Sequence, residues 1–396
     1  MTVRPINFAH KLNYNKYRPE IESLADPSFH SSELFGLEMA ELTDLEYNIL
    51  NSNLIKYGKE NVVLVKTNFH NKEFVCLIGT NYSLNKFLLE LCLKNDNSFF
   101  EELRLTLLNY TDYHLGSFKI GDKQFFNENS YVMGIINATP DSFSDGGKYL
   151  SPEKAIDRGI EMFDKGVDII DIGGESTRPG AGKVSIEEEI NRTILIIKGI
   201  LKNRSEAVIS IDTTKSEVAE TALKEGALIV NDISGLTFDS KMLETVVKYE
   251  AALIIMHIKG IPKNMQDNPV YEEVINDVYE FLKRQSTIAL QAGVKTVLVD
   301  PGIGFGKRVS DNYEILNRLD EFMGLGLPIL IGLSKKSFIG EVLDLTVDER
   351  ENATIVAETK AVKSGAVIVR THNIDKALEA KKILNFIDNP NLVING

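Results

Sequence analysis

From residue 131 to the C-terminus, short apolar runs alternate with longer segments in which apolar positions recur every three or four residues. The short runs are rich in Val, Ile and Leu and carry few polar residues before their ends, which is typical of parallel strands buried on both faces of a sheet. The expected strands span residues 131–136, 167–172, 207–212, 227–232, 252–257, 296–300, 328–333 and 366–370.

The longer segments have the periodicity of amphipathic helices. Several of them end in Gly directly before the next apolar run, where a left-handed C-cap favours glycine. Eight strand units separated by helices predict a closed (β/α)₈ TIM barrel of the α/β class rather than an open sheet. The expected helices span residues 151–166, 185–201, 215–226, 239–250, 271–293, 311–322 and 351–365.

The first 114 residues follow another plan. Residues 61–67 and 74–80 predict the two strands of a hairpin, and residues 83–95 and 99–110 predict helices. We therefore expect a small α+β N-terminal domain at 1–114, whose role is open, with a scaffold or a dimerisation surface as the simplest interpretations. The second domain spans 115–396: a hairpin at 115–130, with Gly-Asp at its turn, could plug the bottom of the barrel at 131–396.

Composition and net charge limit the kinds of binding partner and cellular compartment that we expect. The chain has 396 residues and a formal net charge of −13, which argues against nucleic acid or an anionic membrane as the main partner. No apolar run approaches the roughly 18 residues of a spanning helix, and the N-terminus has no continuous apolar region of a secretory signal. Two cysteines, Cys76 and Cys92, are too few for a disulfide framework, so we expect a reduced, cytoplasmic setting.

Every expected strand ends in a side chain that can bond a polar ligand. Because the chemistry of TIM barrels lies at the carboxyl ends of the strands, these side chains should share one pocket. They are Asn137, Asp171, Asp212, Asn231 with Asp232, His257, Asp300, the group Ser334 to Ser337, and Arg370 with His372.

The first two strand ends favour binding of an anion and a metal ion. Asn137 opens the polar loop INATPDSFSDGG, and one amide oxygen suffices for Mg²⁺ if a diphosphate supplies the other ligands. The alternative is a capped turn shaped by Pro140 and Gly146. Arg178, in DIGGESTRPGAG, can contact a carboxylate or phosphate, and the alternative is a structural Arg in a solvated turn.

The middle strand ends favour a planar, nitrogen-rich heterocycle. Asp212 and Asp300 would accept from its N–H groups and Asn231 would bond its polar edge, whereas the alternative role of each is a helix N-cap, most plausible for Asp212 before TTKSEV. The stretch DPGIGFGK is neither a dinucleotide fingerprint nor a phosphate-binding Walker loop, and its glycines would let Phe305 approach a ligand ring. His257 fits a polar core residue and a ligand equally well.

The last two strand ends carry cations. Of the adjacent Lys335 and Lys336, one should point inward because the pair directly follows an apolar strand. Arg370 and His372 are two residues apart and lie on the same face if the chain stays extended.

These motifs, taken together, resemble the dihydropteroate synthase family, here with an N-terminal extension, and the resemblance covers the chain from about Leu115 to the C-terminus. Separate motifs in the right order around a barrel are more specific than any one alone. The motifs are GIINATPDSFSDGG, DIGGESTRPGA, SIDTTK, VNDISG, MHIKGIPKNMQDNPVY, DPGIGFGK, GLSKKSFIG and VRTHN.

The resemblance implies an enzyme, a transferase of folate biosynthesis that condenses 6-hydroxymethyl-7,8-dihydropterin diphosphate with p-aminobenzoate and is a target of sulfonamides. It implies Mg²⁺ as cofactor, held by Asn137, small-molecule substrates as partners, and a homodimer. The implied pterin-binding residues are Asp212, Asn231, Met256, Asp300, Phe305 and Lys336. The implied diphosphate-binding residues are Asn137, Arg178, Arg370 and His372. The implied p-aminobenzoate-binding residues are Thr177, Arg178, Pro179, Phe305 and Ser337. The implied catalytic residues are Lys336, Asp212, Asp300, Arg370 and His372.

The chain departs from the family pattern at Lys335, where Arg is usual, and at Asn373, where Asp is usual and which could change how His372 is oriented. Two other functions fit a pterin-binding barrel. A corrinoid-dependent methyltransferase would share the Asp and Asn positions but would not need the cations after the last strands. A catalytically silent pterin-binding module would leave the function to the N-terminal domain, and an arylamine other than p-aminobenzoate is a third alternative.

Overall fold

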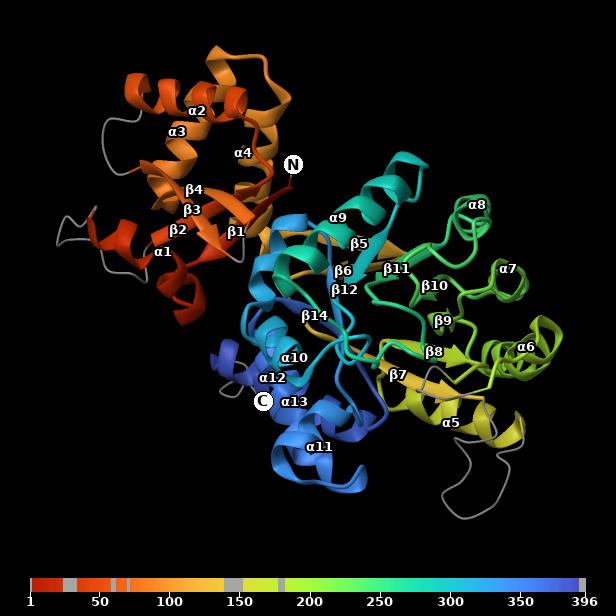
Figure 1. Ribbon diagram of the computed structural model, residues 1–396. Coiled ribbons are helices and arrows are strands. Elements are labelled where there is room, and N and C mark those ends of the chain that lie inside the picture. Colours follow the sequence, from red (N-terminus) through yellow and green to blue (C-terminus); the bar gives the residue numbers. More distant parts are fainter. Residues whose placement is uncertain are drawn as a thin grey trace. The chain divides into compact units, whose positions relative to one another are not determined.

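The structure is a computed structural model that describes residues 2–23, 34–57, 62–69, 72–138, 152–176 and 182–391 (Figure 1). The chain forms two compact units. Unit 1 comprises Met1–Gly116, Glu272–Glu280 and Asn317–Leu327, and unit 2 comprises Ser117–Tyr271, Phe281–Leu316 and Pro328–Gly396. Unit 1 therefore includes two segments that the sequence assigned to the barrel domain.

Unit 1 is built on a four-stranded antiparallel sheet with the order β1-β2-β4-β3. Leu77 of the sheet and Leu88 and Leu103 of the helices belong to its apolar core. The strands and helices contributed by Met1–Gly116 are β1 (Thr2–Asn7), α1 (Lys11–Ser23), β2 (Leu34–Ala40), α2 (Asp44–Tyr57), β3 (Val62–Phe69), β4 (Lys72–Thr80), α3 (Asn81–Lys94), α4 (Ser98–Thr111) and the 3-10 helix η1 (Tyr113–Leu115).

The predicted hairpin β3–β4 and the predicted helices α3 and α4 are confirmed. The sequence pattern does not predict β1, α1, β2 or α2. Strand β1 contains Arg4 and Pro5, and it is an edge strand, where proline is tolerated. Helix α1 contains Pro19 and few apolar residues, so its periodicity is weak.

Unit 2 is a closed barrel of eight parallel strands in the order β10-β11-β12-β13-β14-β7-β8-β9, which confirms the predicted TIM barrel. Each strand lies where an apolar run was noted, because strands buried on both faces need apolar residues throughout. The strands are β7 (Tyr131–Asn137), β8 (Ile169–Gly173), β9 (Ile209–Asp212), β10 (Ile229–Asp232), β11 (Ala252–Met256), β12 (Val297–Asp300), β13 (Ile329–Gly332) and β14 (Ala366–Thr371).

Helices connect these strands, and several end in the expected left-handed glycine, such as Gly226 (φ +101°) and Gly365 (φ +98°). The α-helices are α5 (Pro152–Asp164), α6 (Ile186–Asn203), α7 (Ser216–Lys224), α8 (Met242–Lys248), α9 (Val274–Gln291), α10 (Val309–Asn317), α11 (Ser337–Leu343), α12 (Glu351–Lys363) and α13 (Ile374–Asp388). The 3-10 helices η3 (Leu319–Leu325) and η4 (Asp348–Arg350) lie in the same part of the sequence. None of the helices within the described ranges is both long and apolar enough to cross a membrane.

The hairpin of β5 (Ser117–Ile120) and β6 (Lys123–Phe126) lies at the amino-terminal end of the barrel. The Thr296 hydroxyl donates to the Lys119 carbonyl over 2.7 Å, and Leu228 lies against Gly121. Leu228 and Thr296 directly precede β10 and β12, so the hairpin covers the end opposite the polar strand ends.

Candidate active site

Arg370, near the end of β14, joins the ends of two other strands. Its Nε donates to Asp171 Oδ2 of β8 over 2.6 Å, and its Nη2 donates to Asp212 Oδ2 of β9 over 2.5 Å. Asn231 of β10 donates to the same Asp171 oxygen over 3.2 Å. One guanidinium therefore binds two carboxylates. Side chains from the four strands β8, β9, β10 and β14 meet at this place.

Burial shifts the pKa values of Asp212 and Arg370. It raises the pKa of Asp212 to about 7 even though Arg370 favours the ionised form. Burial also lowers the pKa of Arg370, but Asp171 and Asp212 more than offset this and raise that pKa above its ordinary value. Arg370 stays charged, whereas Asp212 can take up a proton near neutral pH.

Asp300 ends β12 and anchors the glycine-rich loop that follows. Its Oδ1 accepts from the Gly302 N–H over 2.7 Å. Gly302 has φ +70°, and a Cβ there would lie 1.9 Å from the His257 carbonyl oxygen, so only glycine fits. Burial raises the pKa of Asp300 to about 6, although the Gly302 N–H and Lys336 oppose the shift.

Lys336 follows β13, and its Nζ lies 4.0 Å from the centroid of the Phe305 ring. Burial lowers the pKa of Lys336 to about 8, while the attraction of Asp300 opposes the shift. Phe305 packs with Met256, at the end of β11, and with Met265 in a small buried apolar cluster. The arrangement places a flat apolar surface beside carboxylates, an amide and an ammonium.

His372, directly after β14, lies between two polar side chains. Its Nε2 is 3.3 Å from Asn137 Nδ2 at the end of β7, and its Nδ1 is 3.1 Å from Ser334 Oγ. The His372 backbone N–H also donates to Ser334 Oγ over 3.3 Å. Asn373 caps α13 by accepting from the Lys376 N–H over 3.2 Å, whereas Ser334 and Asn137 contact the His372 ring.

The expected site residues fall into three groups. Contacts and electrostatic interactions connect Asp212, Asn231, Asp300, Phe305, Met256, Lys336 and Arg370, and a separate contact joins Asn137 to His372. Ser337 is the exposed first residue of α11. Thr177, Arg178 and Pro179 lie outside the described residues, as does the loop from Thr139 to Ser151.

Two interpretations from the sequence are settled by geometry. Asp212 is not a helix N-cap, because the cap position of α7 is Lys215 and the Ser216 N–H bonds Asp239 instead. His257 is a polar core residue: it is 6% exposed, and its Nδ1 lies 2.9 Å from Lys307 Nζ. Burial holds the pKa of His257 well below its ordinary value.

The sequence analysis places Ser334 among the strand-end side chains, but it does not identify Lys307 as a residue with a structural role in the site. The Lys307 ammonium is buried and donates to the carbonyl oxygens of Gly302 (2.9 Å) and Phe305 (3.2 Å), which fixes the glycine-rich loop. Burial lowers its pKa to about 7. A lysine after glycines has no periodicity that would reveal this role.

The candidate site offers few side chains that could bind a metal ion, which suits an ion that takes only few ligands from the protein. Within the described ranges, no three His, Cys, Asp or Glu side chains are grouped to hold a metal ion. Asn137 brings one neutral amide to the end of β7, beside His372. This donor set fits Mg²⁺, which keeps several waters and takes its remaining oxygens from a phosphate ligand.

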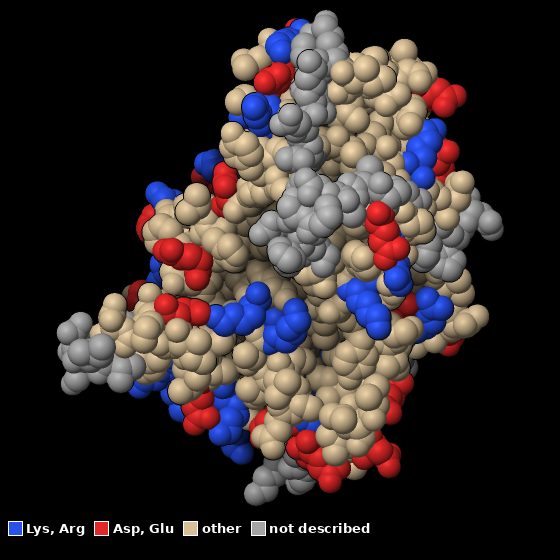
Figure 2. All heavy atoms as spheres, turned by 90° about the vertical axis from the view of Figure 1, so that its left-hand side faces the viewer, with Lys and Arg blue, Asp and Glu red and all other residues tan. Residues whose placement is uncertain are grey.

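On the face shown in Figure 2, Lys and Arg side chains lie interspersed with Asp and Glu over the described residues. The two cysteines, Cys76 and Cys92, are both free thiols. The face in Figure 2 therefore carries mixed rather than uniformly positive charge, whereas the candidate site offers the cations Lys336 and Arg370 to an anionic ligand.

Comparison with known proteins gives a consistent result. Residues 133–372 match the model of the family described as pterin binding enzyme. The dihydropteroate synthase of Synechocystis sp. is 43% identical over 278 residues, which are 69% of this chain and 96% of that protein. The structure of Yersinia pestis dihydropteroate synthase with a sulfonamide drug superposes with a TM-score of 0.65 at 35% identity, covering 69% of this chain and 99% of the other. That of the Xanthomonas albilineans enzyme with 4-aminobenzoic acid gives 0.64 at 34%, covering 69% and 98%.

Proposed function

This chain belongs to the pterin-binding enzymes and, among them, to the dihydropteroate synthases, and we propose that it condenses 6-hydroxymethyl-7,8-dihydropterin diphosphate with p-aminobenzoate. The products are 7,8-dihydropteroate and pyrophosphate. The observation that carries the proposal is the group of Asp212, Asp300, Lys336 and Arg370, whose charges interact at the carboxyl ends of four barrel strands.

The pterin ring would be held by its polar edge and one face. Asp212 and Asp300 would accept from its N–H groups, Asn231 and Lys336 would bond its remaining polar atoms, and Phe305 would cover a face. Part of this arrangement exists before the pterin binds, because Lys336 and Asp300 already attract each other. This pre-organisation lowers the cost of ordering the site when the pterin binds.

The reaction would break the bond between the pterin methylene carbon and the diphosphate oxygen. The developing positive charge spreads over the ring, and Asp212 and Asp300 stabilise it when they are ionised. Arg370 and His372 would stabilise the negative charge that builds up on the leaving diphosphate. Mg²⁺, when bound through Asn137 and the diphosphate, supplies Lewis-acid neutralisation of the same charge.

The arylamine needs positioning rather than activation, because its nitrogen is neutral near pH 7 and has a free electron pair. The new carbon–nitrogen bond forms as this pair attacks the methylene carbon, and the resulting ammonium loses a proton to solvent. Ser337, Phe305 and the residues Thr177, Arg178 and Pro179 are the proposed contacts of p-aminobenzoate. We expect sulfonamides to compete for the same place.

Two further features belong to this proposal, and two alternatives to it make different predictions. A homodimer and a cytoplasmic location accord with the family resemblance and with the free thiols of Cys76 and Cys92. The methyltransferase alternative predicts methyl transfer from methyltetrahydrofolate to a corrinoid. The silent-module alternative predicts pterin binding without turnover.

The test is pyrophosphate release by the full-length protein with Mg²⁺, the dihydropterin diphosphate and p-aminobenzoate, with the pteroate product identified by mass. Lys336→Ala should lower kcat/KM at least about 100-fold, since a bond to the pterin and a nearby positive charge are lost together. Lys198→Ala, on the exposed side of α6, is the matched control. Turnover by Lys336→Ala at the rate of the control would refute the assignment of Lys336, and pterin binding without any turnover by the unmodified protein would favour the silent module.

A further inference from the structure

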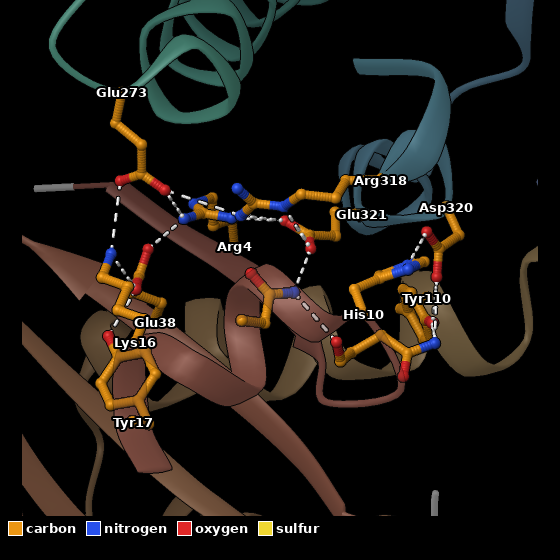
Figure 3. A network of polar contacts seen from close by, with 12 residues as sticks. Arg4, His10, Lys16, Tyr17, Glu38, Tyr110, Glu273, Arg318, Asp320 and Glu321 are labelled. Carbon is orange, nitrogen blue, oxygen red and sulfur yellow. Dashed lines mark hydrogen bonds and ion pairs between the residues drawn. The ribbon is translucent and has the colours of Figure 1, made fainter. Parts of the chain in front are cut away.

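A buried ion network lies inside unit 1 and does not take part in the proposed chemistry (Figure 3). At its centre is Arg4 of β1, which is 1% exposed. Its guanidinium pairs with Glu273 over 2.6 Å and with Glu38 of β2 and Glu321 of η3. A single side chain near the N-terminus thus binds two carboxylates that lie 269 and 317 residues further along the chain.

The charges of the network balance. Lys16 pairs with Glu38 over 2.7 Å, and Arg318 pairs with Glu321 over 2.9 Å, so three cations face three carboxylates. Burial raises the pKa of Glu38, but Arg4 and Lys16 more than offset this and lower it to about 2. A buried ion without its partner is strongly unfavourable, so each of these residues depends on the others.

A second contact holds the same segment. Asp320, beside Glu321, accepts from Asn7 over 3.1 Å and from the Tyr110 hydroxyl over 3.0 Å, and it lies 2.7 Å from His10 Nε2. The start of η3 is therefore fixed by β1, by α4 and by the residues between β1 and α1.

Glu273 lies at the end of the loop that connects β11 to α9, and this loop contacts the glycine-rich loop after β12. Gln266 of the loop donates to the Gly304 carbonyl over 2.6 Å, and the Tyr271 hydroxyl donates to the Gly306 carbonyl over 2.7 Å. Tyr271 precedes Glu273 by two residues. The ion pair of Glu273 therefore fixes the chain directly after the contacts that hold the glycine-rich loop.

The glycine-rich loop after β12 is also connected to the ion network, through α10. The glycine-rich loop after β12 leads into α10, whose Asn312 Oδ1 accepts from the Gly304 N–H over 2.7 Å. Arg318 directly follows α10, and Glu321 is three residues later. Both loops that surround Phe305 thus continue into residues of the ion network.

We propose that Arg4 is a positioning residue for the pterin pocket: by holding Glu273 and Glu321 it fixes the two loops that carry Met265 and Phe305. The N-terminal segment is then part of the catalytic apparatus without contacting the substrate. This inference rests on the proposed function for its kinetic test, but not for its structural test.

The first test compares Arg4→Met with Leu88→Ala, which removes a buried side chain of α3 from the core of unit 1 and leaves the network intact. Hydrogen exchange in the full-length protein should become at least fivefold faster in residues 257–271 of Arg4→Met and stay unchanged there in Leu88→Ala. In turnover assays, Arg4→Met should raise KM for the dihydropterin diphosphate at least fivefold and change kcat less, whereas Leu88→Ala should not change KM.

Two variants separate position from stability. Arg4→Met with Glu273→Gln removes the excess negative charge and should regain thermal stability, yet KM should stay raised because the connection is still broken. If Arg4→Met does not fold, Glu273→Gln alone breaks the ion pair between Arg4 and Glu273 and should give the same faster exchange and raised KM. Unchanged loop exchange and unchanged KM in Arg4→Met, with an active unmodified enzyme, would overturn the inference, whereas absence of turnover in the unmodified enzyme would instead count against the proposed function.

Discussion

Removal of the Arg370 guanidinium should lower the free energy of unfolding of the barrel by about 3 kcal/mol, because breaking a buried ion pair leaves an uncompensated charge. The charge in question is that of Asp171, which is 0% exposed and keeps only the 3.2 Å bond from Asn231 once the 2.6 Å bond from Arg370 is gone. Asp212 contributes less, because its pKa of about 7 lets it take up a proton instead.

Arg370→Met keeps most of the side-chain volume and is the perturbation of choice. Adding Asp171→Asn removes the unpaired charge and keeps the shape, so the double variant should regain about 2 kcal/mol. The chain has no tryptophan, so unfolding by the denaturant guanidinium chloride is best followed by far-UV circular dichroism. If the two units give separate transitions, only that of unit 2 should shift.

Turnover measurements separate the role of Arg370 in stability from its proposed role at the leaving diphosphate. Both the single and the double variant should lose at least about 100-fold in kcat/KM for pyrophosphate release, because neither has a cation to meet the leaving group. A loss of stability below about 1 kcal/mol in Arg370→Met, without any gain in the double variant, would show that Asp171 is not the ionised partner described here.

The remaining predictions concern pH, backbone and metal. The value of kcat/KM should fall below about pH 7, as Asp212 and Asp300, with pKa values raised to about 7 and about 6, take up protons, and it should fall above about pH 8, as Lys336 loses a proton. A profile that stays flat well below the lower limit and well above the upper one would contradict the proposed charges. Gly302→Ala should cost at least about 2 kcal/mol because its Cβ would meet a carbonyl oxygen, whereas Gly182→Ala, with open space around it, should change thermal stability little; equal melting temperatures would exclude the clash. Chelation with EDTA should abolish turnover and added Mg²⁺ should restore it, and turnover that persists in excess chelator would remove the metal from the proposal.

The barrel could be predicted because its physical requirement is local. A strand buried on both faces is apolar in sequence, and a polar residue at its end is conspicuous, as Asp212 and Asp300 are. Strands β1 and β2 could not be predicted in this way. Arg4 and Glu38 are buried in them at 1% exposure each, and their partners are far away in sequence, so a core position has the appearance of a surface position.

The site shows the same division. That the strand-end residues converge follows from topology, but which of them pair does not. The bridge from Arg370 to Asp171 and Asp212 depends on side-chain direction across three strands, and the support of His372 by Ser334 depends on a contact between residues 38 positions apart. Such contacts leave no periodic trace.

Unit 1 is discontinuous in sequence, and this has a consequence for how the protein could have evolved. The N-terminal segment and the downstream residues Glu273, Arg318 and Glu321 form one charge-balanced set. In a synthase without the segment, Glu273 and Glu321 would lack their partner Arg4 and the buried charges would no longer balance, so selection would have no reason to keep these three residues. The segment and the three charges should therefore be inherited together, and lineages that lose one should lose the other.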